Sequence, residues 1–260
     1  MSIFLILSFV LFFDISLRFN WWRKNVDLKY PRVYMYHSID SHLGNKRRDK
    51  WRVKKEDFEK QLEWLNKNGW RSFFVGELVE VDNLPEKSFA ITFDDGYLNN
   101  FTNAFDLLKK YNFKATIYLV SDKILNDWEK FEDKNFDKLL NKEDILLMQY
   151  SRLVEFGAHT LTHKNLNIIS SKEAKIEIEN SKKSVENLCN KECKTFAYPY
   201  GKYNNEIIDL VKNAGFTSAV LVKRGVFKKD KQFEIERIGI LGTENFFDFY
   251  LKTMKIRNKF

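Results

Sequence analysis

Short apolar runs alternate along the chain with longer stretches of helical spacing. Residues 32–36 and 88–93 are apolar runs rich in strand-forming side chains, as buried strands are. Between them, residues 55–68 repeat apolar positions at helical spacing and are followed by Gly69, which is typical of a helix end. This alternation predicts a parallel sheet covered by helices.

The rest of the chain continues the alternation, except for the charged residues 122–141, where we expect an inserted loop or short helices. The predicted fold class is α/β, a deformed (β/α) barrel of about seven parallel strands. Further helices are expected at residues 98–111, 143–155, 172–188 and 206–214, and further strands at residues 114–120, 195–198, 218–222 and 234–241.

The first residues follow a different pattern. Residues 3–13 are apolar except for Ser8, which predicts a signal-like segment or a short, tilted membrane anchor, although a spanning helix needs roughly 20 such residues. A core strand is the alternative, but strands usually have ~5 to 6 residues. We therefore divide the chain into a membrane anchor or signal-like segment, residues 1–25, and one folded domain, residues 26–260. The candidate interfacial residues are Trp21, Trp22, Arg23 and Lys24.

Charge narrows the choice of partners. The chain has 260 residues, with 44 Lys and Arg against 36 Asp and Glu, a net charge of +8. Such a charge suits an anionic surface, such as a phosphate-bearing glycan or lipid headgroups. The lysines are spread along the chain rather than gathered in one basic arm, so we interpret the excess as compositional bias and expect no nucleic-acid partner. The sequence indicates no obligate protein partner.

Two short motifs carry the candidate chemistry. Asp94 and Asp95 directly follow the strand predicted at residues 88–93, and His159 and His163 follow a short run that could also be a strand. In barrels of alternating strands and helices, active sites form at the carboxyl ends of the strands. We therefore expect the two acids and the two imidazoles to meet at one end of the barrel.

These side chains suit a divalent metal ion. Zinc in a catalytic site takes three protein ligands and leaves one position for water, and Asp95, His159 and His163 would supply the three. The ion lowers the pKa of water to about 7, but a base must still accept the proton, and Asp94 is the candidate base. Zinc is the expected ion; cobalt, nickel and manganese are acceptable alternatives. Singly, each motif could be a solvated turn or a local hydrogen-bond pair, so the hypothesis depends on their occurring together.

On these motifs the chain resembles the polysaccharide deacetylase family, carbohydrate esterase family four. The match covers residues 31–241 and includes Thr-Phe-Asp-Asp-Gly at residues 92–96 and His-Thr-x-x-His at residues 159–163. The resemblance implies that Asp94 is the catalytic base. The metal ligands that it implies are Asp95, His159 and His163.

The family's third motif corresponds to Tyr-Pro-Tyr-Gly at residues 198–201. The resemblance implies an oxyanion-binding turn there, in which the backbone N–H of Tyr200 faces the oxyanion. We place Pro199 and Thr160, the latter inside the His-containing motif, on the same substrate side. An ordinary Pro-Tyr-Gly turn is the alternative interpretation.

The chain departs from the family pattern at two positions. The family's usual Arg before the third motif is absent, and we expect Arg237 to hold Asp94 ionised in its place; an exposed structural Arg is the alternative. The family's late Leu-x-His is also absent, because no histidine follows His163. His37, directly after the first strand, is the candidate general acid, since the first and last strands of a nearly closed barrel are neighbours. A structural histidine is the alternative there.

The resemblance implies a hydrolase of carbon–nitrogen bonds other than peptide bonds, a metal-dependent de-N-acetylase of an N-acetylhexosamine-containing cell-envelope or surface polysaccharide. The expected partners are an acetylated glycan and, through the N-terminal segment, a membrane whose face stays open. Two alternatives remain. One is a sugar-binding pseudoenzyme of the same fold, and the other is a metal-dependent carbohydrate O-acetyl esterase, for which a missing acid matters less because an ester leaving group needs less protonation.

Overall fold

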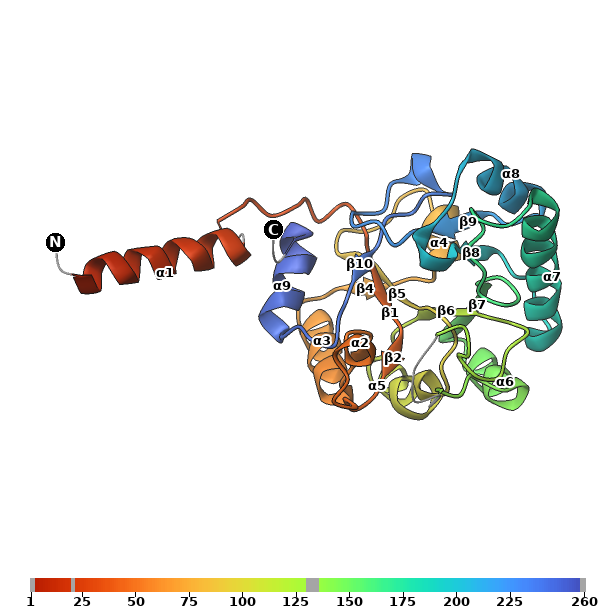
Figure 1. The fold of residues 1–260 in the computed structure, drawn as a ribbon, viewed down its shortest axis with the longest axis horizontal. Coiled ribbons are helices and arrows are strands. Elements are labelled where there is room, and N and C mark those ends of the chain that lie inside the picture. Colours follow the sequence, from red (N-terminus) through yellow and green to blue (C-terminus); the bar gives the residue numbers. More distant parts are fainter. Residues whose placement is uncertain (1–2, 20–21, 130–135, 258–260) are drawn as a thin grey trace.

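A computed structural model describes residues 3–19, 22–129 and 136–257. Seven strands form a curled sheet in which the neighbouring strands named below pair in parallel, and helices surround its outer side (Figure 1). This confirms the predicted deformed barrel of the α/β class. In sheet order the strands are β10 (Ile238–Gly239), β1 (Arg32–Tyr36), β5 (Ser88–Phe93), β6 (Ala115–Leu119), β7 (Val154–Ala158), β8 (Thr195–Ala197) and β9 (Ser218–Val220).

The first strand lies in the middle of one half of the sheet, between β5 and β10. Tyr34 of β1 is in register with Ile91 of β5 on one side and with Ile238 of β10 on the other. The predicted contact between the first and last strands is therefore confirmed. Three short strands lie apart from this path: β4 (Arg71–Ser72) pairs with β5, and β2 (Ser38–Ile39) pairs with β3 (Arg52–Val53).

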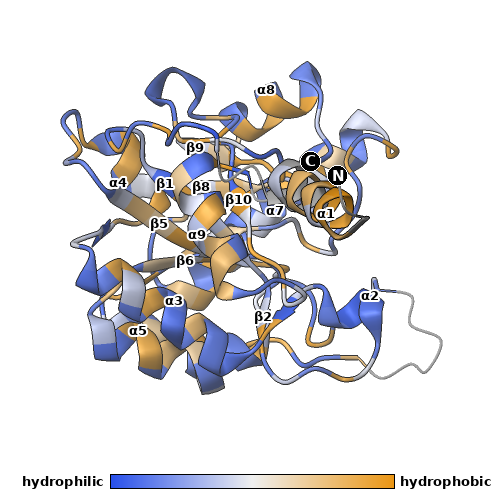
Figure 2. Cartoon of the chain, turned by 90° about the vertical axis from the view of Figure 1, so that its left-hand side faces the viewer, coloured by the Kyte–Doolittle hydropathy of each residue, from blue (hydrophilic) through white to orange (hydrophobic). Residues whose placement is uncertain are grey.

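The sheet is buried on both faces, as expected for parallel strands covered by helices. Most of the helices pack against the outer face, where their apolar sides contact the larger core (Figures 1 and 2). The short helix α4 contacts both β5 and β9, strands far apart in sheet order, so it lies across the inside of the curl. The helices are α2 (Lys46–Asp49), α3 (Lys55–Lys67), α4 (Val75–Glu80), α5 (Phe105–Tyr111), α6 (Lys142–Tyr150), α7 (Ser171–Cys189), α8 (Asn205–Asn213) and α9 (Phe246–Lys255).

Two predicted boundaries were wrong. The helix expected at residues 143–155 ends at Tyr150, because Arg152 takes a left-handed conformation (φ 62°) and the chain then enters β7. The strand expected at residues 234–241 is regular only over β10, although Ile235 forms a parallel bridge to Val220 of β9. That bridge brings the two ends of the curled sheet together.

The helix expected at residues 98–111 has two parts. A π-helical turn, η1 (Asn100–Ala104), precedes α5. The side chain of Asn100 donates a hydrogen bond to the backbone oxygen of His37 (2.8 Å), and Asn103 donates one to that of Ile39 (2.8 Å). π-Turns are frequent at functional sites, and this one fixes the segment that follows β1.

The N-terminal helix α1 (Ile3–Phe19) projects away from the domain (Figure 1), and its apolar side chains are exposed over residues 4–13. Within the described residues, no helix combines the length and apolar character that a membrane crossing requires. Trp21 of the predicted interfacial group and residues 130–135 of the predicted insertion lie outside the described residues.

Candidate active site

Asp94 and Asp95 lie where β5 ends and the chain turns. Asp94 donates its backbone N–H to the oxygen of Tyr36 (3.0 Å), which continues the pairing of β5 with β1. Asp95 and Gly96 then take φ values of 74° and 76°, so the chain reverses immediately. A Cβ on Gly96 would lie 2.7 Å from the Leu119 side chain, so this turn requires glycine. Both carboxylates are buried at the carboxyl end of the sheet, as predicted.

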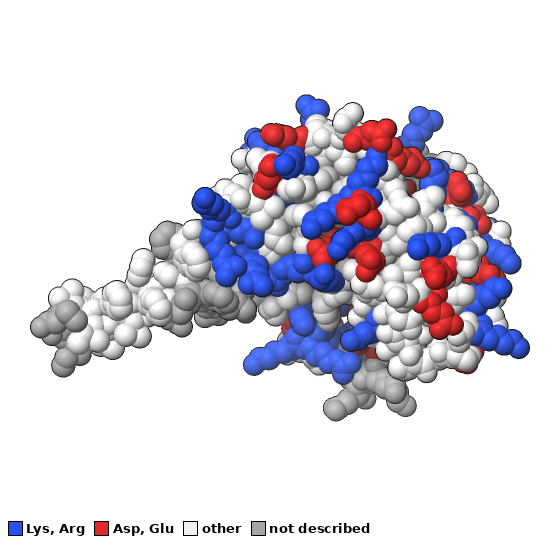
Figure 3. All heavy atoms as spheres, turned by 90° about the horizontal axis from the view of Figure 1, so that it is seen from above, with Lys and Arg blue, Asp and Glu red and all other residues white. Residues whose placement is uncertain are grey.

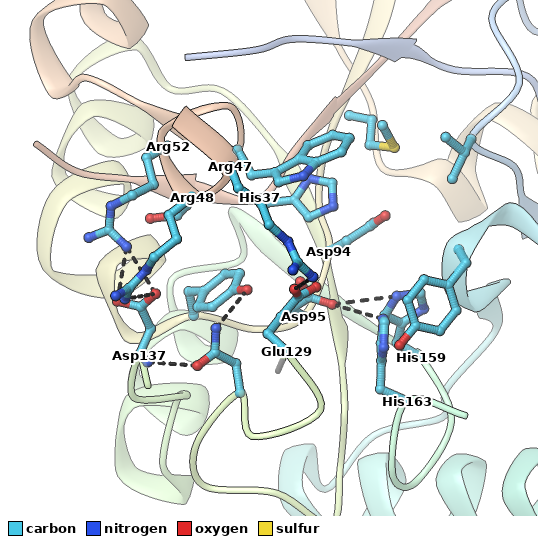
Figure 4. A pocket seen from close by; sticks show the side chains of 17 residues that line it. His37, Arg47, Arg48, Arg52, Asp94, Asp95, Glu129, Asp137, His159 and His163 are labelled. Carbon is cyan, nitrogen blue, oxygen red and sulfur yellow. Dashed lines mark hydrogen bonds and ion pairs between the residues drawn. The ribbon is translucent and has the colours of Figure 1, made fainter. Parts of the chain in front are cut away.

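Three of the predicted residues converge beside this turn. Asp95 Oδ1 lies 3.6 Å from His159 Nε2 and 3.3 Å from His163 Nε2, and Figure 4 shows both imidazoles directed at the carboxylate. One ligand atom from each of the three residues lies within 4.8 Å of the others, and all three residues are buried. The structure thus brings together the three side chains predicted as metal ligands.

The donor set fits a cation. His159 Nδ1 lies 2.8 Å from the backbone oxygen of Ala197, so that nitrogen carries the proton and the Nε2 lone pair faces Asp95. Burial lowers the pKa of both His159 and His163, so both rings are neutral at pH 7. Among the described residues, Asp95 Oδ1 has no hydrogen-bond donor. Acceptor atoms that face one another in a buried site are unfavourable unless a cation, or a proton on one of them, lies between them.

Backbone strain gathers at the same residues. Thr160, His163 and Tyr200 have φ values of 65°, 61° and 59°, and Asp95 has 74°. Positive φ is unfavourable for side chains with a Cβ and persists where the surrounding structure imposes it, often at functional sites. Four predicted site residues therefore share a conformation that their positioning, rather than local preference, explains.

Glu177, on α7, holds the loop that carries the histidines. Its buried carboxylate accepts hydrogen bonds from the backbone N–H groups of Leu161 and Thr162 (3.0 Å each) and from the Thr162 hydroxyl (2.6 Å). Thr160 adds a bond within the loop, since its hydroxyl accepts the backbone N–H of His163 (3.0 Å). Sequence reasoning missed Glu177, because a single acid on a charged helix matches no motif.

We expect Glu177→Ala to weaken zinc binding by roughly 10- to 100-fold, the usual effect of removing a group that orients a metal ligand. The loop would lose three hydrogen bonds, and His163 would be held less firmly. Competition with a chromophoric chelator measures the affinity. Glu179→Ala is the matched control, because Glu179 lies on the same helix in a surface pair with Lys175. Equal affinities for the two variants would contradict this role.

Arg237 binds Asp94 through two parallel hydrogen bonds. Its Nη1 and Nη2 atoms donate to the two carboxylate oxygens at 2.6 and 2.7 Å, and Nη1 also donates to the Thr92 hydroxyl (3.0 Å). Arg237 is 0% exposed. Burial would raise the pKa of Asp94, but the guanidinium brings it well below its usual value. The structure therefore places Arg237 where it was predicted, and Asp94 stays ionised.

His37 lies directly after β1, in the part of the cavity wall that Trp51 also lines. Its ring packs on Trp51, with ring centroids 4.5 Å apart. Burial lowers the pKa of His37 to about 4, while the charge of Asp94 opposes that shift. Its Nδ1 is buried without a partner among the described residues. His37 and Asp94, the predicted base, line the same cavity.

The third motif forms a one-turn 3₁₀ helix, η2 (Pro199–Gly201), after β8. The Tyr200 ring packs edge-on against His163 (centroids 4.6 Å apart) and is 48% exposed, so it lines the cavity wall. Pro199 is buried beneath it. The oxyanion role of the Tyr200 N–H and the substrate contacts of Pro199 and Thr160 stay predictions.

The charged loop after β6, which includes Trp128 and Asp137, lies at the edge of the site. None of its residues was predicted to belong to the site. The Trp128 ring stacks on His163 with centroids 4.8 Å apart. Arg52 forms two hydrogen bonds of 2.9 Å to Asp137, and Arg48 pairs with the same carboxylate at 3.3 Å. These contacts tie the loop after β6 to the segment around α2 (Figure 4). In sequence this loop shows only scattered charges, so nothing there indicated which of its residues would reach the metal ligands.

The residues described above enclose a cavity of about 280 Å³. A volume of this size can hold one sugar unit or an acetamido group. Residues of the charged loop, such as Glu129 and Asp137, form part of its wall. Metal ligands lie on one side, and Asp94 and His37 face the same space. The residues that line it are Met35, His37, Ser38, Arg47, Arg48, Trp51, Arg52, Asp94, Asp95, Tyr97, Asn126, Glu129, Asp137, His159, His163, Tyr200 and Val222.

Comparisons with known proteins show which family the chain is similar to. Residues 81–219 match the model of the family described as polysaccharide deacetylase. The Bacillus subtilis protein YxkH, named as a polysaccharide deacetylase, is 31% identical over 90% of this chain and 80% of its own length. The poly-β-1,6-N-acetyl-D-glucosamine N-deacetylase of Staphylococcus aureus is 26% identical over 81% of this chain and 77% of its own.

A crystal structure from Bacillus anthracis, also named as a polysaccharide deacetylase, superimposes with a TM-score of 0.73 at 26% identity and covers 88% of this chain and 69% of that one. The expected enzyme class, hydrolases of carbon–nitrogen bonds other than peptide bonds, is confirmed. On the family match and on the similarity over nine-tenths of its length, this chain belongs to the polysaccharide deacetylase family.

Proposed function

We propose that the protein removes N-acetyl groups from an N-acetylhexosamine-containing polysaccharide of the cell envelope or surface, in a metal-dependent hydrolysis. The observation that carries the proposal is the convergence of three buried metal-type ligands with a carboxylate that a buried arginine keeps ionised. The substrate class is supported by the Staphylococcus aureus relative, whose name specifies poly-N-acetylglucosamine.

Asp95, His159 and His163 would hold the ion. Zinc suits two imidazoles and one carboxylate, and cobalt, nickel and manganese are acceptable to the same donors. When bound, such an ion polarises the acetamide carbonyl and makes water acidic enough to be deprotonated near pH 7. Everything else in the reaction falls to side chains and backbone groups of the chain itself.

Asp94 accepts the proton of the attacking water as general base. Its depressed pKa keeps it available as an acceptor, and the two bonds from Arg237 fix the direction of its oxygens. The Tyr200 N–H would donate to the oxyanion that forms on the substrate carbonyl; donors of this kind contribute about 3 to 4 kcal/mol in other acyl-transfer enzymes. His37 would then protonate the leaving nitrogen, which leaves poorly as an anion.

We expect Arg237→Gln to shift the acid limb of the pH–rate profile for kcat/KM to higher pH. The pKa of Asp94 would rise because burial would no longer be opposed by the guanidinium, so Asp94 would become protonated at a pH where the native group is ionised. The pKa of Asp94 is lower in the folded protein than in the unfolded chain, where it is about 3.9. The ion pair of Asp94 with Arg237 therefore stabilises the fold above about pH 3.9, and this stabilisation is lost as the pH falls through the folded-state pKa.

Arg237→Lys is the control for charge alone, because it keeps the positive charge but cannot form two parallel bonds. It should shift the acid limb less than Arg237→Gln. A purely structural Arg237 would lower stability in both variants and leave the position of the acid limb unchanged. The profiles are measured by acetate release across a pH series.

For His37→Ala we expect about a 100-fold loss of kcat on an acetamide, the lower end of the range for acid–base catalysis. The loss on a matched O-acetyl ester should be small, because an alkoxide leaves more readily than an amide anion. The native ring has its pKa lowered to about 4 by burial, so it becomes an effective acid only as negative charge develops on the substrate. Equal losses on amide and ester would show that His37 has a structural role.

The experiment that tests the proposal is acetate release from β-1,6-linked N-acetylglucosamine oligomers by the full chain, with zinc or cobalt and after chelation. Metal-dependent release supports it. Cleavage of O-acetyl esters without cleavage of the acetamide would favour the esterase, and sugar binding without either reaction would favour the pseudoenzyme. Either of those results would overturn the proposal.

We also propose that residues 1–25 attach the catalytic domain, residues 26–260, to a membrane of the cell envelope. Apolar side chains of α1 are exposed along residues 4–13, and exposed Trp22 follows the helix. Trp side chains favour the membrane–water interface. Flotation of the full chain with lipid vesicles tests the attachment, and the membrane face stays open.

A further inference from the structure

A cationic hollow lies at the base of α1, on the domain. It is lined by Ile256 and by four cationic residues that we call the basic collar: Arg23, Arg224, Lys255 and Arg257. The residues come from three separate places in the chain, directly after α1, after β9 and at the end of α9, so their proximity could not be seen in the sequence. Figure 3 shows Lys and Arg side chains gathered where α1 meets the domain.

The collar is fixed to the domain rather than carried by α1 alone. The Val26 N–H donates to the backbone oxygen of Met254 (2.7 Å), which pairs the linker with the end of α9. Buried Arg32 donates to the backbone oxygens of Val26 (3.0 Å) and Thr253 (2.8 Å). Lys255 also donates to Asn25 Oδ1 (3.0 Å). These bonds therefore hold the segment that follows α1 against the end of α9, which carries Lys255.

Next to this charge lies an apolar helix that the described part of the domain does not cover. Nine apolar side chains of α1 are between 45% and 78% exposed. A helix that is apolar all round is normally buried in a protein core or in lipid. Trp22 continues the surface, is 52% exposed, and carries the Arg23 guanidinium 5.5 Å from its ring centroid. The nine residues are Phe4, Leu5, Ile6, Leu7, Phe9, Val10, Leu11, Phe12 and Phe13.

We propose that the basic collar binds the anionic headgroups of a lipid bilayer into which α1 inserts its apolar side chains. Apolar residues, an interfacial Trp and cationic residues follow one another from α1 to the domain, in the order in which the acyl region, interface and headgroups follow one another in a membrane. A surface potential from anionic lipids attracts such a cluster, and each basic residue contributes about 1 kcal/mol, or roughly fivefold in affinity. The inference rests on the proposed attachment through α1 and is independent of the chemistry at the metal site.

Docking of this kind would also place the active site. Val222 lines the catalytic cavity, and Arg224, two residues later, lines the collar. Two residues span about 7 Å of extended chain. The collar would thus hold the mouth of the cavity close to the headgroups, so that the enzyme acts on glycan at the membrane surface rather than far from it.

The test compares binding of the full chain to vesicles of phosphatidylcholine alone and to vesicles that also contain phosphatidylglycerol. We expect at least about tenfold tighter binding to the anionic vesicles. High salt should remove the difference, since the screening length falls from about 10 Å at 0.1 M to about 3 Å at 1 M. Arg224→Glu/Arg257→Glu should abolish the preference. The control Lys175→Glu/Lys183→Glu changes charge equally on α7, at the other end of the molecule (Figure 1), and should keep it.

Each outcome separates the collar from the other proposals. Equal binding to both vesicles, unchanged in the Arg224→Glu/Arg257→Glu variant, would overturn the collar and leave attachment through α1 standing. Binding to neither would overturn both. Charge-dependent binding to soluble polyphosphate without binding to vesicles would replace the lipid by another phosphate polymer. Acetate release from soluble oligomers, which we expect both double variants to retain, shows that they are folded and reports on the deacetylase separately.

Discussion

Asp94→Asn should lower kcat for acetamide hydrolysis by about 10⁴-fold, the upper end of what a general base contributes. The amide of Asn cannot accept the water proton. Among the described residues that line the cavity, Asp94 is the carboxylate that Arg237 holds in place. Acetate release from N-acetylglucosamine oligomers at saturating zinc measures the loss. Zinc should still bind, because Asp95, His159 and His163 are unchanged.

The substitution also leaves Arg237 buried without its counter-charge, which should lower the free energy of unfolding by about 3 to 5 kcal/mol. Asp94→Asn/Arg237→Gln removes both charges and should recover most of that stability while remaining inactive. Glu155→Gln is a control for the loss of a partly buried acidic group: Glu155 accepts hydrogen bonds from Thr116 (3.0 Å) and Gly76 (3.4 Å) away from the cavity. Substantial activity in the folded double variant would show that another group is the base.

Most of the candidate metal site could be predicted because the three residues that would bind the ion follow strand ends that the apolar pattern marks. Ser88–Phe93 is buried at every position, so its end could be located, and Asp95 had to lie at the edge of the sheet. The pairing of Arg237 with Asp94 was harder, since 142 residues separate them in sequence. It was expected only as a substitute for the arginine that the family pattern has and this chain lacks, and the fold allows the contact because β10 and β5 both neighbour β1.

The groups that orient the site could not be found in the same way. Glu177 accepts hydrogen bonds from the backbone N–H groups of Leu161 and Thr162, and Asn100 donates one to the backbone oxygen of His37. Side chains that bind backbone atoms leave no pattern in the sequence of their partner. Trp128 is similar, because its contact with His163 depends on the path of a charged loop. Sequence spacing thus predicts residues on regular elements better than residues that reach across loops.

Chelation of the metal should reduce acetate release to background, and zinc should restore it. An ion held by Asp95, His159 and His163 would separate acceptor atoms that face one another in a buried site, so its binding should also stabilise the fold, by about 2.7 kcal/mol at 100 times its Kd. In the metal-free protein, burial and the neighbouring Asp94 raise the pKa of Asp95 well above its usual value. Zinc binding to Asp95 would release that proton, so zinc affinity should fall as pH falls.

His163→Ala should lose both the activity and the zinc-dependent rise in Tm, since two ligands remain where three are needed. His42→Ala is the matched control: its Nε2 lies 3.1 Å from the backbone oxygen of Arg52, outside the triad, and the variant should respond to zinc like the native chain. Isothermal titration at two pH values and thermal unfolding with and without zinc measure these effects. Full activity after exhaustive chelation would contradict the metal-dependent mechanism, because Asp94 would then have to activate water without an ion.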